Sequence, residues 1–174
     1  MALVILTGAS GSGKTTIAET IERQRAGQVR VLRFDTIGVP SPEERIAGWG
    51  HLEGGWQRAK TVEWLANIAK ARGPLPVLFE GQMRIAYIQE GLATAGIEAA
   101  RIILVHCDDA ARMHRLCHER KQPELANPDM MNWSRYLRRE AEAGGFEILD
   151  TSGISTDQSV DYVCERLGVG RSVP

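Results

Sequence analysis

The sequence has few cysteines, almost no net charge and no long apolar run, and each shortage narrows the class of protein. Its three cysteines, Cys107, Cys117 and Cys164, are an odd number in widely separated places, which fits a reducing, cytoplasmic setting better than an oxidising one. The net charge of −1 gives no support for the basic surface that nucleic acid binding needs. No apolar run approaches the length of a membrane span, so we expect no membrane partner.

The sequence shows no internal repeat and no low-complexity tract, and we expect no export signal. The opening apolar run at residues 2–6 is too short for a signal peptide, follows no basic segment and leads directly into a glycine-rich loop. A chain of 174 residues is the size of one domain with a proper core, and its composition is ordinary for a soluble globular protein. We therefore expect one domain spanning residues 1–174.

What the sequence does contain is a phosphate-binding signature near its beginning. Residues 8–15 are GASGSGKT, which matches the pattern G-x-x-x-x-G-K-[ST] of the Walker A motif, or P-loop. The apolar run before the motif predicts a buried strand, and residues 16–22 predict the first turns of a helix. A strand, a glycine-rich loop and a helix are the context that this motif requires, which disfavours the alternative of an unrelated glycine-rich turn.

Each part of the motif has a role in holding a triphosphate. Glycines allow the loop to turn its N–H groups inward around phosphate oxygens, and the helix that follows adds its positive end. Lys14 is placed to reach the β- and γ-phosphates, and Thr15 to bind Mg²⁺. With ATP and Mg²⁺ as ligands, the expected nucleotide site contains Gly8, Ala9, Ser10, Gly11, Ser12, Gly13, Lys14, Thr15 and Thr16.

Short apolar runs alternate with helical patterns along the rest of the chain. Further strands are expected at residues 29–34, 75–79, 101–107 and 146–150. Helices are expected from residue 42 and over about 56–71, 84–95, 108–119, 130–143 and 156–167. This alternation is typical of an α/β protein with a parallel sheet covered by helices on both faces. Ligands gather at the carboxyl ends of such strands, so the residues at those ends are the functional candidates.

Asp35 ends the second predicted strand, which should lie near the P-loop. A carboxylate there can orient an acceptor hydroxyl and take its proton, although an aspartate that begins a turn is the alternative. The segment that follows, about residues 36–60, is rich in glycine and contains Trp49 and Trp56. We expect this segment to form the acceptor side of the site, with both tryptophans on a flexible flap.

With these features the sequence resembles the P-loop kinases related to nucleoside, nucleotide, shikimate and gluconate kinases. The resemblance covers nearly the whole chain in element order. It implies a three-layer P-loop NTPase fold with a five-stranded parallel sheet in the order 2-3-1-4-5. It also implies ATP with Mg²⁺ and transfer of the γ-phosphoryl group. Shikimate and gluconate kinases carry acceptor-binding carboxylates at the place where Asp35 stands.

The segment EGQMR at residues 80–84 resembles the Asp-Gly-Phe-Pro-Arg segment of adenylate kinases. The resemblance implies that Glu80 helps to hold the Mg²⁺ water shell and that Arg84 meets a phosphate of the acceptor. Carboxylate oxygens suit Mg²⁺, and a guanidinium binds an anion with two parallel hydrogen bonds. We therefore predict Asp35, Glu80, Gly81 and Arg84 as acceptor-binding residues and Thr15 and Glu80 as metal-binding ones. A helix-capping Glu80 and a solvated Arg84 are the alternatives.

Arg112, Arg115 and Arg120 resemble the Arg-Leu-x-x-(x)-Arg segment at the mouth of the kinase lid, here expected over about residues 115–132. The resemblance implies that one arginine packs on the base or its phosphates and that another stabilises the transferring group. We assign Arg115 to both nucleotide binding and catalysis, and Arg120 to catalysis together with Lys14 and Asp35. The alternative is a solvated helix face paired with nearby acids, and Arg112 fits either interpretation.

The loop DTSG at residues 150–153 resembles a kinase loop whose backbone lies against adenine, which assigns Gly153 to the nucleotide, although an ordinary turn is the alternative. The AMP-site pattern and the long lid of adenylate kinases are missing, so we expect a small polar metabolite, a nucleoside or an antibiotic-like molecule as acceptor. The protein is expected to be a monomer or a homodimer. A polynucleotide 5′-kinase, which would need a basic stripe, and an ATP-binding regulator without transfer activity stay open.

Overall fold

The computed structural model describes residues 2–38, 40–49, 54–71 and 73–170. Its strands are β1 (Leu3–Thr7), β2 (Arg30–Arg33), β3 (Val77–Glu80), β4 (Arg101–His106) and β5 (Glu147–Asp150). Its α-helices are α1 (Lys14–Gln24), α2 (Pro42–Trp49), α3 (Gly55–Lys70), α4 (Ile85–Thr94), α5 (Asp109–His114), α6 (Pro128–Gly144) and α7 (Thr156–Leu167). The strands form one parallel sheet in the order β2-β3-β1-β4-β5, which confirms the expected α/β fold and strand order.

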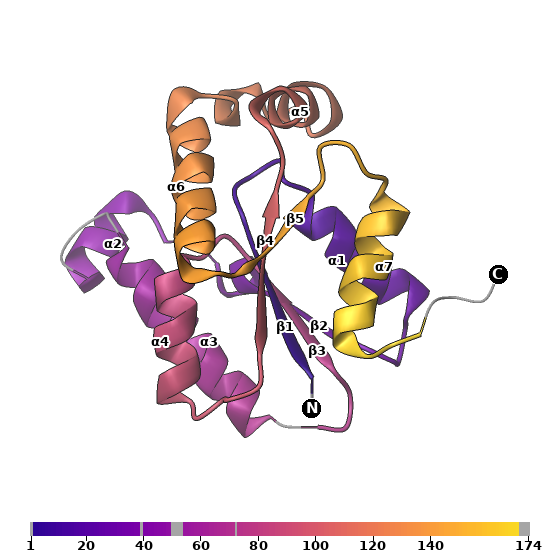
Figure 1. Ribbon diagram of the computed structural model, residues 1–174. Coiled ribbons are helices and arrows are strands. Elements are labelled where there is room, and N and C mark those ends of the chain that lie inside the picture. The colour runs from indigo at the N-terminus through magenta and orange to yellow at the C-terminus, as the bar shows by residue number, and fades with distance from the viewer. Residues whose placement is uncertain (1, 39, 50–53, 72, 171–174) are drawn as a thin grey trace.

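The sheet lies between two layers of helices. Figure 1 shows α1 and α7 on one face of the sheet and α3, α4 and α6 on the other. Successive side chains of a strand point to opposite faces, so Leu3 and Ile5 enter one apolar cluster while Val4 and Leu6 enter the other. Every residue of β1 is buried, which explains why this strand is an unbroken apolar run in the sequence.

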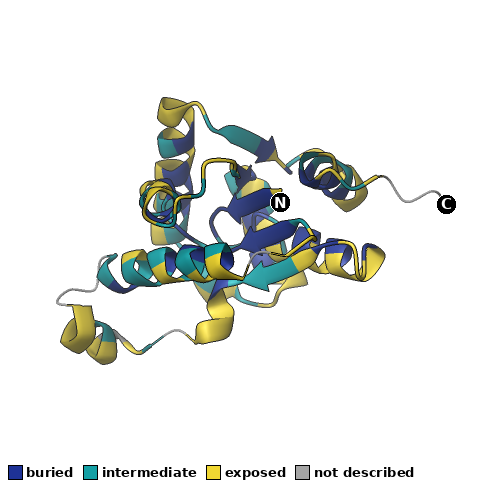
Figure 2. Ribbon diagram, turned by 90° about the horizontal axis from the view of Figure 1, so that it is seen from below, coloured by how far each residue is buried: buried dark blue, intermediate teal, exposed yellow. Residues whose placement is uncertain are grey.

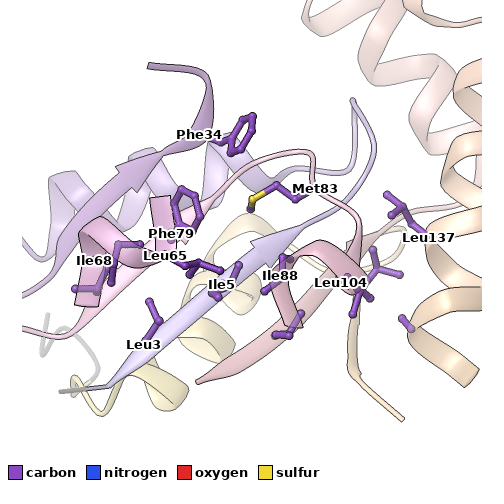
Figure 3. Close-up of a cluster of buried hydrophobic side chains, with 14 of the residues drawn as sticks. Leu3, Ile5, Phe34, Leu65, Ile68, Phe79, Met83, Ile88, Leu104 and Leu137 are labelled. Carbon is purple, nitrogen blue, oxygen red and sulfur yellow. The ribbon is translucent and has the colours of Figure 1, made fainter. Parts of the chain in front are cut away.

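The larger apolar cluster fills the space between the sheet and α3, α4 and α6. Figure 3 shows Ile5 and Phe79 of the central strands beside Leu65 and Ile68 of α3, with Leu137 of α6 at the other end. The central strands are the most buried part of the molecule, whereas α2 lies at its margin and is mostly exposed (Figure 2). This buried packing fixes the positions of the strands and therefore of their carboxyl ends.

Contrary to the prediction from the sequence, Trp56 does not lie on an exposed flap. Its side chain is only 7% exposed and meets Phe34 edge to face, with 5.5 Å between the ring centroids. It therefore belongs to the apolar core, because the first turn of α3 turns it toward the sheet. Trp49, at the end of α2, is 36% exposed and keeps the exposed position that a flap residue needs. The expected flap also includes residues 50–53, which lie outside the described residues.

Several element boundaries differ from the expected ones for local reasons. The helix expected at residues 130–143 begins earlier, at Pro128, because the Asn127 side chain accepts a hydrogen bond from the Met130 N–H at 2.9 Å. The helix expected at residues 108–119 changes into a π-helical turn, Arg115–Glu119, after α5. Among the described helices, none combines the length and the apolar character that crossing a bilayer requires.

Candidate functional site

The glycine-rich loop connects β1 to α1 at the carboxyl edge of the sheet. Gly13 has φ +100° and Gly8 has φ +153°, conformations that other residues rarely adopt. A side chain on Gly8 would also overlap the Val105 carbonyl oxygen of β4. The sequence motif therefore has a physical basis here, since glycine alone allows the loop to bend this closely over the sheet.

Lys14 is buried at the start of α1, with 7% of its surface exposed, and its ammonium group donates a hydrogen bond to the Ala9 carbonyl at 3.2 Å. Burial lowers the pKa of Lys14 to about 8, although the carboxylates of Glu80 and Asp35 partly oppose that effect. Arg112 and Arg120 lower the pKa further by charge repulsion. A positively charged, incompletely compensated group at this point is suited to an anionic ligand.

Lys14→Met is expected to stabilise the ligand-free protein at pH 7. The folded state keeps the buried lysine charged only at a cost in stability. This cost is complete below the folded pKa of about 8 and disappears as the pH approaches 10.5, the ordinary pKa of lysine. The cost at pH 7 is of the order of 3 kcal/mol. Urea unfolding of both proteins at pH 7 and at about pH 9.5 tests this expectation. A stability gain that does not shrink at the higher pH would contradict it.

Two carboxylates lie near Lys14 at the ends of neighbouring chain segments. Glu80 ends β3 and is 6% exposed, and burial raises the pKa of its carboxyl above the usual range, with Lys14 opposing and Asp35 adding to the rise. Asp35 is exposed and lies in a 3₁₀ turn, Phe34–Ile37, that directly follows β2. The structure thus brings together three of the predicted site residues, Lys14, Asp35 and Glu80.

Gly81 explains why the two acidic segments lie so close. A side chain at this position would overlap the β-carbon of Phe34, the residue immediately before Asp35. The next residues are fastened to β1 and the P-loop: the Met83 N–H donates to the Thr7 hydroxyl at 3.1 Å, and the Ser10 hydroxyl donates to the Gln82 side chain at 3.2 Å. Gly81 therefore has a packing role, and no contact of its own points to a ligand.

Arg84 lies among three aromatic rings at the N-terminus of α4. Its guanidinium carbon is 5.6 Å from the ring centroid of Tyr87, 5.6 Å from that of Trp133 and 5.2 Å from that of Tyr136. Within the described part of the chain, the guanidinium forms no hydrogen bond or ion pair. Rings that cover the face of a guanidinium leave its N–H edge available, so Arg84 fits neither a structural ion pair nor a fully solvated position.

The π-helical turn brings Arg115 and Arg120 to the same side. The Arg120 N–H bonds to the Arg115 carbonyl at 2.9 Å, five residues back. A spacing of five separates two side chains by roughly 140° on an α-helix but by only about 50° in this wider turn. Arg115 also donates to the Thr151 hydroxyl at 2.8 Å and to the Thr151 carbonyl at 2.7 Å, so it is fixed, whereas Arg120 is exposed.

A cavity of about 300 Å³ lies at the P-loop between these groups and α1. An adjoining cavity of about 270 Å³ extends toward the start of α7, and the two share Gly13, Thr16, Arg115 and Glu119. The first is lined by Gly11, Gly13, Lys14, Thr15, Thr16, Glu19, Arg115, Glu119 and Arg120. The second adds Ile17, Thr151, Ile154, Ser155, Thr156 and Ser159. A larger hollow of about 480 Å³ against α7 contains none of the predicted site residues.

The sequence missed some of these lining residues. Ile154 and Ser155 line the second cavity in the loop where Gly153 was predicted, and Gly153 itself is exposed and absent from that lining. The pattern Ser-x-x-Gln at residues 155–158 was a detectable signal, because Ser155 caps α7. Glu19 and Glu119 had no signal beyond helical spacing from Thr15 and Arg115.

Arg112 differs from both interpretations that the sequence left open. Its side chain is fully buried, at 0% exposure, and donates hydrogen bonds to the Ser10 carbonyl at 2.6 Å and the Cys107 carbonyl at 3.0 Å. A third bond, of 2.6 Å, reaches the Ser134 hydroxyl of α6. Arg112 is therefore part of neither a solvated face nor the cavity lining, and burial lowers the pKa of its guanidinium.

Compared by sequence, the chain matches no protein-family model and no curated protein. Its structure is similar to a tunicamycin resistance protein from Deinococcus radiodurans, with a TM-score of 0.69, 18% identity and 100% of both chains covered. A gluconokinase from Sinorhizobium meliloti has a TM-score of 0.66 at 15% identity, covering 96% of this chain and 91% of that one. A shikimate kinase from Acinetobacter baumannii in complex with shikimate has a TM-score of 0.61 at 17% identity, covering 93% of this chain and 90% of that one. The predicted likeness to the P-loop kinases is confirmed at the level of the fold.

Proposed function

We propose that this chain, whose fold is that of the P-loop kinases, transfers the γ-phosphoryl group of ATP to a hydroxyl group of a small molecule. The observation that supports this most is the meeting of Lys14, Asp35 and Glu80 beside the P-loop cavity. Of these three residues, phosphate binding by the loop needs only the lysine. An exposed carboxylate next to it is what a hydroxyl acceptor needs.

On the donor side, the chain's own residues bind and orient the phosphates. The N–H groups of the loop and the N-terminus of α1 hold the phosphate oxygens, and Lys14 moves its bond from the Ala9 carbonyl to the nucleotide. The Thr15 hydroxyl and the Glu80 carboxylate are oxygen donors of the kind that Mg²⁺ prefers, so they would hold the ion directly or through water. Bound Mg²⁺ supplies charge neutralisation between the phosphates.

On the acceptor side, Asp35 orients the hydroxyl and accepts its proton as the hydroxyl oxygen bonds to the γ-phosphorus and the bond from that phosphorus to the departing ADP breaks. Arg84 offers its N–H edge to an anionic group, and its three aromatic neighbours keep that edge in place. The proposed acceptor class is therefore a small molecule with both a hydroxyl and a carboxylate or phosphate. The structural neighbour that holds shikimate is consistent with such an acceptor.

A transfer screen with labelled ATP tests this proposal. The panel contains hydroxy acids, sugar acids, nucleosides, nucleotides, oligonucleotides, amino alcohols and antibiotics, and it includes tunicamycin because of the Deinococcus radiodurans neighbour. We expect label in one hydroxyl-bearing compound and a sharp rise in ADP production when it is present. Label in oligonucleotide 5′ ends would favour a polynucleotide kinase. ATP binding with no transfer to any compound would favour a regulator.

Arg120→Met is expected to lower kcat by about 10²- to 10³-fold while changing ADP affinity less than threefold, because the exposed guanidinium acts on charge that develops during transfer. Stopped-assay kinetics and calorimetric ADP binding measure the two effects. Arg23→Met, an exposed arginine at the far end of α1, is the matched control and should leave both unchanged. An unchanged kcat in Arg120→Met would remove Arg120 from the mechanism.

A further inference from the structure

Arg112 joins three segments of the chain that meet under the P-loop. Its guanidinium reaches the Ser10 carbonyl of the loop, the Cys107 carbonyl that follows β4 and the Ser134 hydroxyl of α6. Among the described residues, no carboxylate forms an ion pair with it. A buried charge without a counterion is costly, so a stabilising role alone does not account for an arginine at this place.

The contact with Ser10 fixes the direction of one peptide group of the loop. In a trans peptide the carbonyl and the following N–H point in opposite directions, so the bond from Arg112 to the Ser10 oxygen turns the Gly11 N–H the other way. Gly11 lines the P-loop cavity. The arginine therefore sets the orientation of a phosphate-binding N–H from behind the loop.

The next two carbonyls of the loop are held in the same manner. The Cys107 thiol donates to the Gly11 carbonyl at 3.4 Å, and the Thr151 hydroxyl donates to the Ser12 carbonyl at 2.9 Å. Arg115 also donates to these two carbonyls, at 3.4 Å and 3.5 Å. The charge-assisted bond from Arg112 to the Ser10 carbonyl, at 2.6 Å, is the shortest of these contacts. Side-chain donors thus fix the directions of three successive loop carbonyls, and Arg112 holds the first of them.

Close packing leaves the arginine and the loop little freedom to move apart. A β-carbon on Gly11 would lie 3.1 Å from the γ-carbon of Arg112 and 3.1 Å from the γ-carbon of Leu116. The glycine is therefore needed for contact with the arginine as well as for its φ of +78°. The same helix continues into the turn that carries Arg115 and Arg120, so Arg112 connects the loop to the lid arginines.

We propose that Arg112 is a positioning residue of the donor site, which holds the Ser10 carbonyl outward and so presents the loop N–H groups to the nucleotide phosphates. The inference rests on the proposed nucleotide binding, but it concerns a residue that touches no ligand. It predicts that the loss of Arg112 impairs phosphate binding beyond any loss of stability. Its bond to Ser134, by contrast, serves only to anchor α6.

The test compares Arg112→Met, Arg112→Lys and Ser134→Ala with the unmodified protein. We expect Arg112→Met to weaken ADP binding by about tenfold or more, because a charge-assisted hydrogen bond that orients the loop is lost. The ADP affinity of Arg112→Lys should lie between those of Arg112→Met and the unmodified protein. Lysine keeps a charge, but its single nitrogen cannot replace the two guanidinium nitrogens that reach Ser10 on one side and Cys107 and Ser134 on the other. Ser134→Ala, which removes only the α6 contact, should lower the Tm and keep the ADP affinity within twofold.

Hydrogen exchange without nucleotide supplies a second readout. The amides of residues 8–13 should exchange faster in both Arg112 variants, whereas Ser134→Ala, which removes only the α6 contact, should leave their exchange unchanged. The inference would be overturned if the Arg112 variants had a lower Tm but an unchanged ADP affinity and unchanged exchange of the loop amides. If Arg112→Met does not fold, the same two measurements on Arg112→Lys test the inference. An unmodified protein that fails to bind ADP would refute the proposed function instead, and loop exchange would still decide the role of Arg112.

Discussion

Lys14→Met is expected to reduce phosphoryl transfer by about 10³-fold. Lys14 is the positive group at the base of the P-loop cavity, and burial has already removed much of its water. A charge in such a site stabilises the transferring group far more than it would in bulk water. Methionine keeps the length of the side chain and removes the charge.

Unfolding cannot explain this loss if the stability argument for Lys14 is right. The same substitution is expected to make the ligand-free protein more stable at pH 7, because burial lowers the pKa of Lys14 to about 8. A variant that is more stable yet inactive would separate the catalytic role of the charge from any role in folding. Retention of more than about a tenth of the transfer rate would place the donor site elsewhere.

Asp35→Asn is expected to lower kcat by about 10²- to 10⁴-fold, with ATP affinity within twofold of the unmodified protein. Asparagine has the shape of aspartate but cannot take the proton of the acceptor hydroxyl. Asp35 is exposed, and its backbone carbonyl, which accepts from the Gly38 N–H at 3.1 Å, is unaffected by the change. The substitution should therefore leave the 3₁₀ turn in place.

Steady-state kinetics with the true acceptor, together with calorimetric ATP binding, measure this effect. Thr36→Ala, which alters the neighbouring exposed side chain and its 2.7 Å bond to the Arg33 carbonyl, is a matched control and should keep kcat within about threefold. Full activity in Asp35→Asn would show that the base role is wrong. A loss of ATP affinity equal to the loss of rate would show that Asp35 acts on the donor instead.

The fold could be predicted because its signals are local. The strand β1 is buried on both faces, so its apolar run is unbroken, and the glycines of the P-loop occupy conformations that only glycine tolerates. The acids at the ends of β2 and β3 were visible for the same reason, since the carboxyl edge of a parallel sheet is where polar side chains meet. Strand order came from the family resemblance.

Features that depend on tertiary contacts could not be predicted. A pattern of charges along a helix cannot show that Arg112 faces P-loop carbonyls, because the donors and acceptors are about a hundred residues apart in the sequence, as the separation of 102 between Ser10 and Arg112 shows. A helical period of 3.6 cannot reveal the π-helical turn that aligns Arg115 with Arg120. Trp56 lies in a glycine-rich segment, yet the sheet buries it.

The most direct test of the proposed function follows the γ-phosphoryl group of ATP by phosphorus NMR, with Mg²⁺ and the acceptor that the transfer screen identifies. We expect one phosphate ester formed for each ADP released, ester formation about 10³-fold slower with Lys14→Met, and little ADP without acceptor. Release of inorganic phosphate at the same rate with and without every acceptor would contradict the proposal that this chain is a kinase.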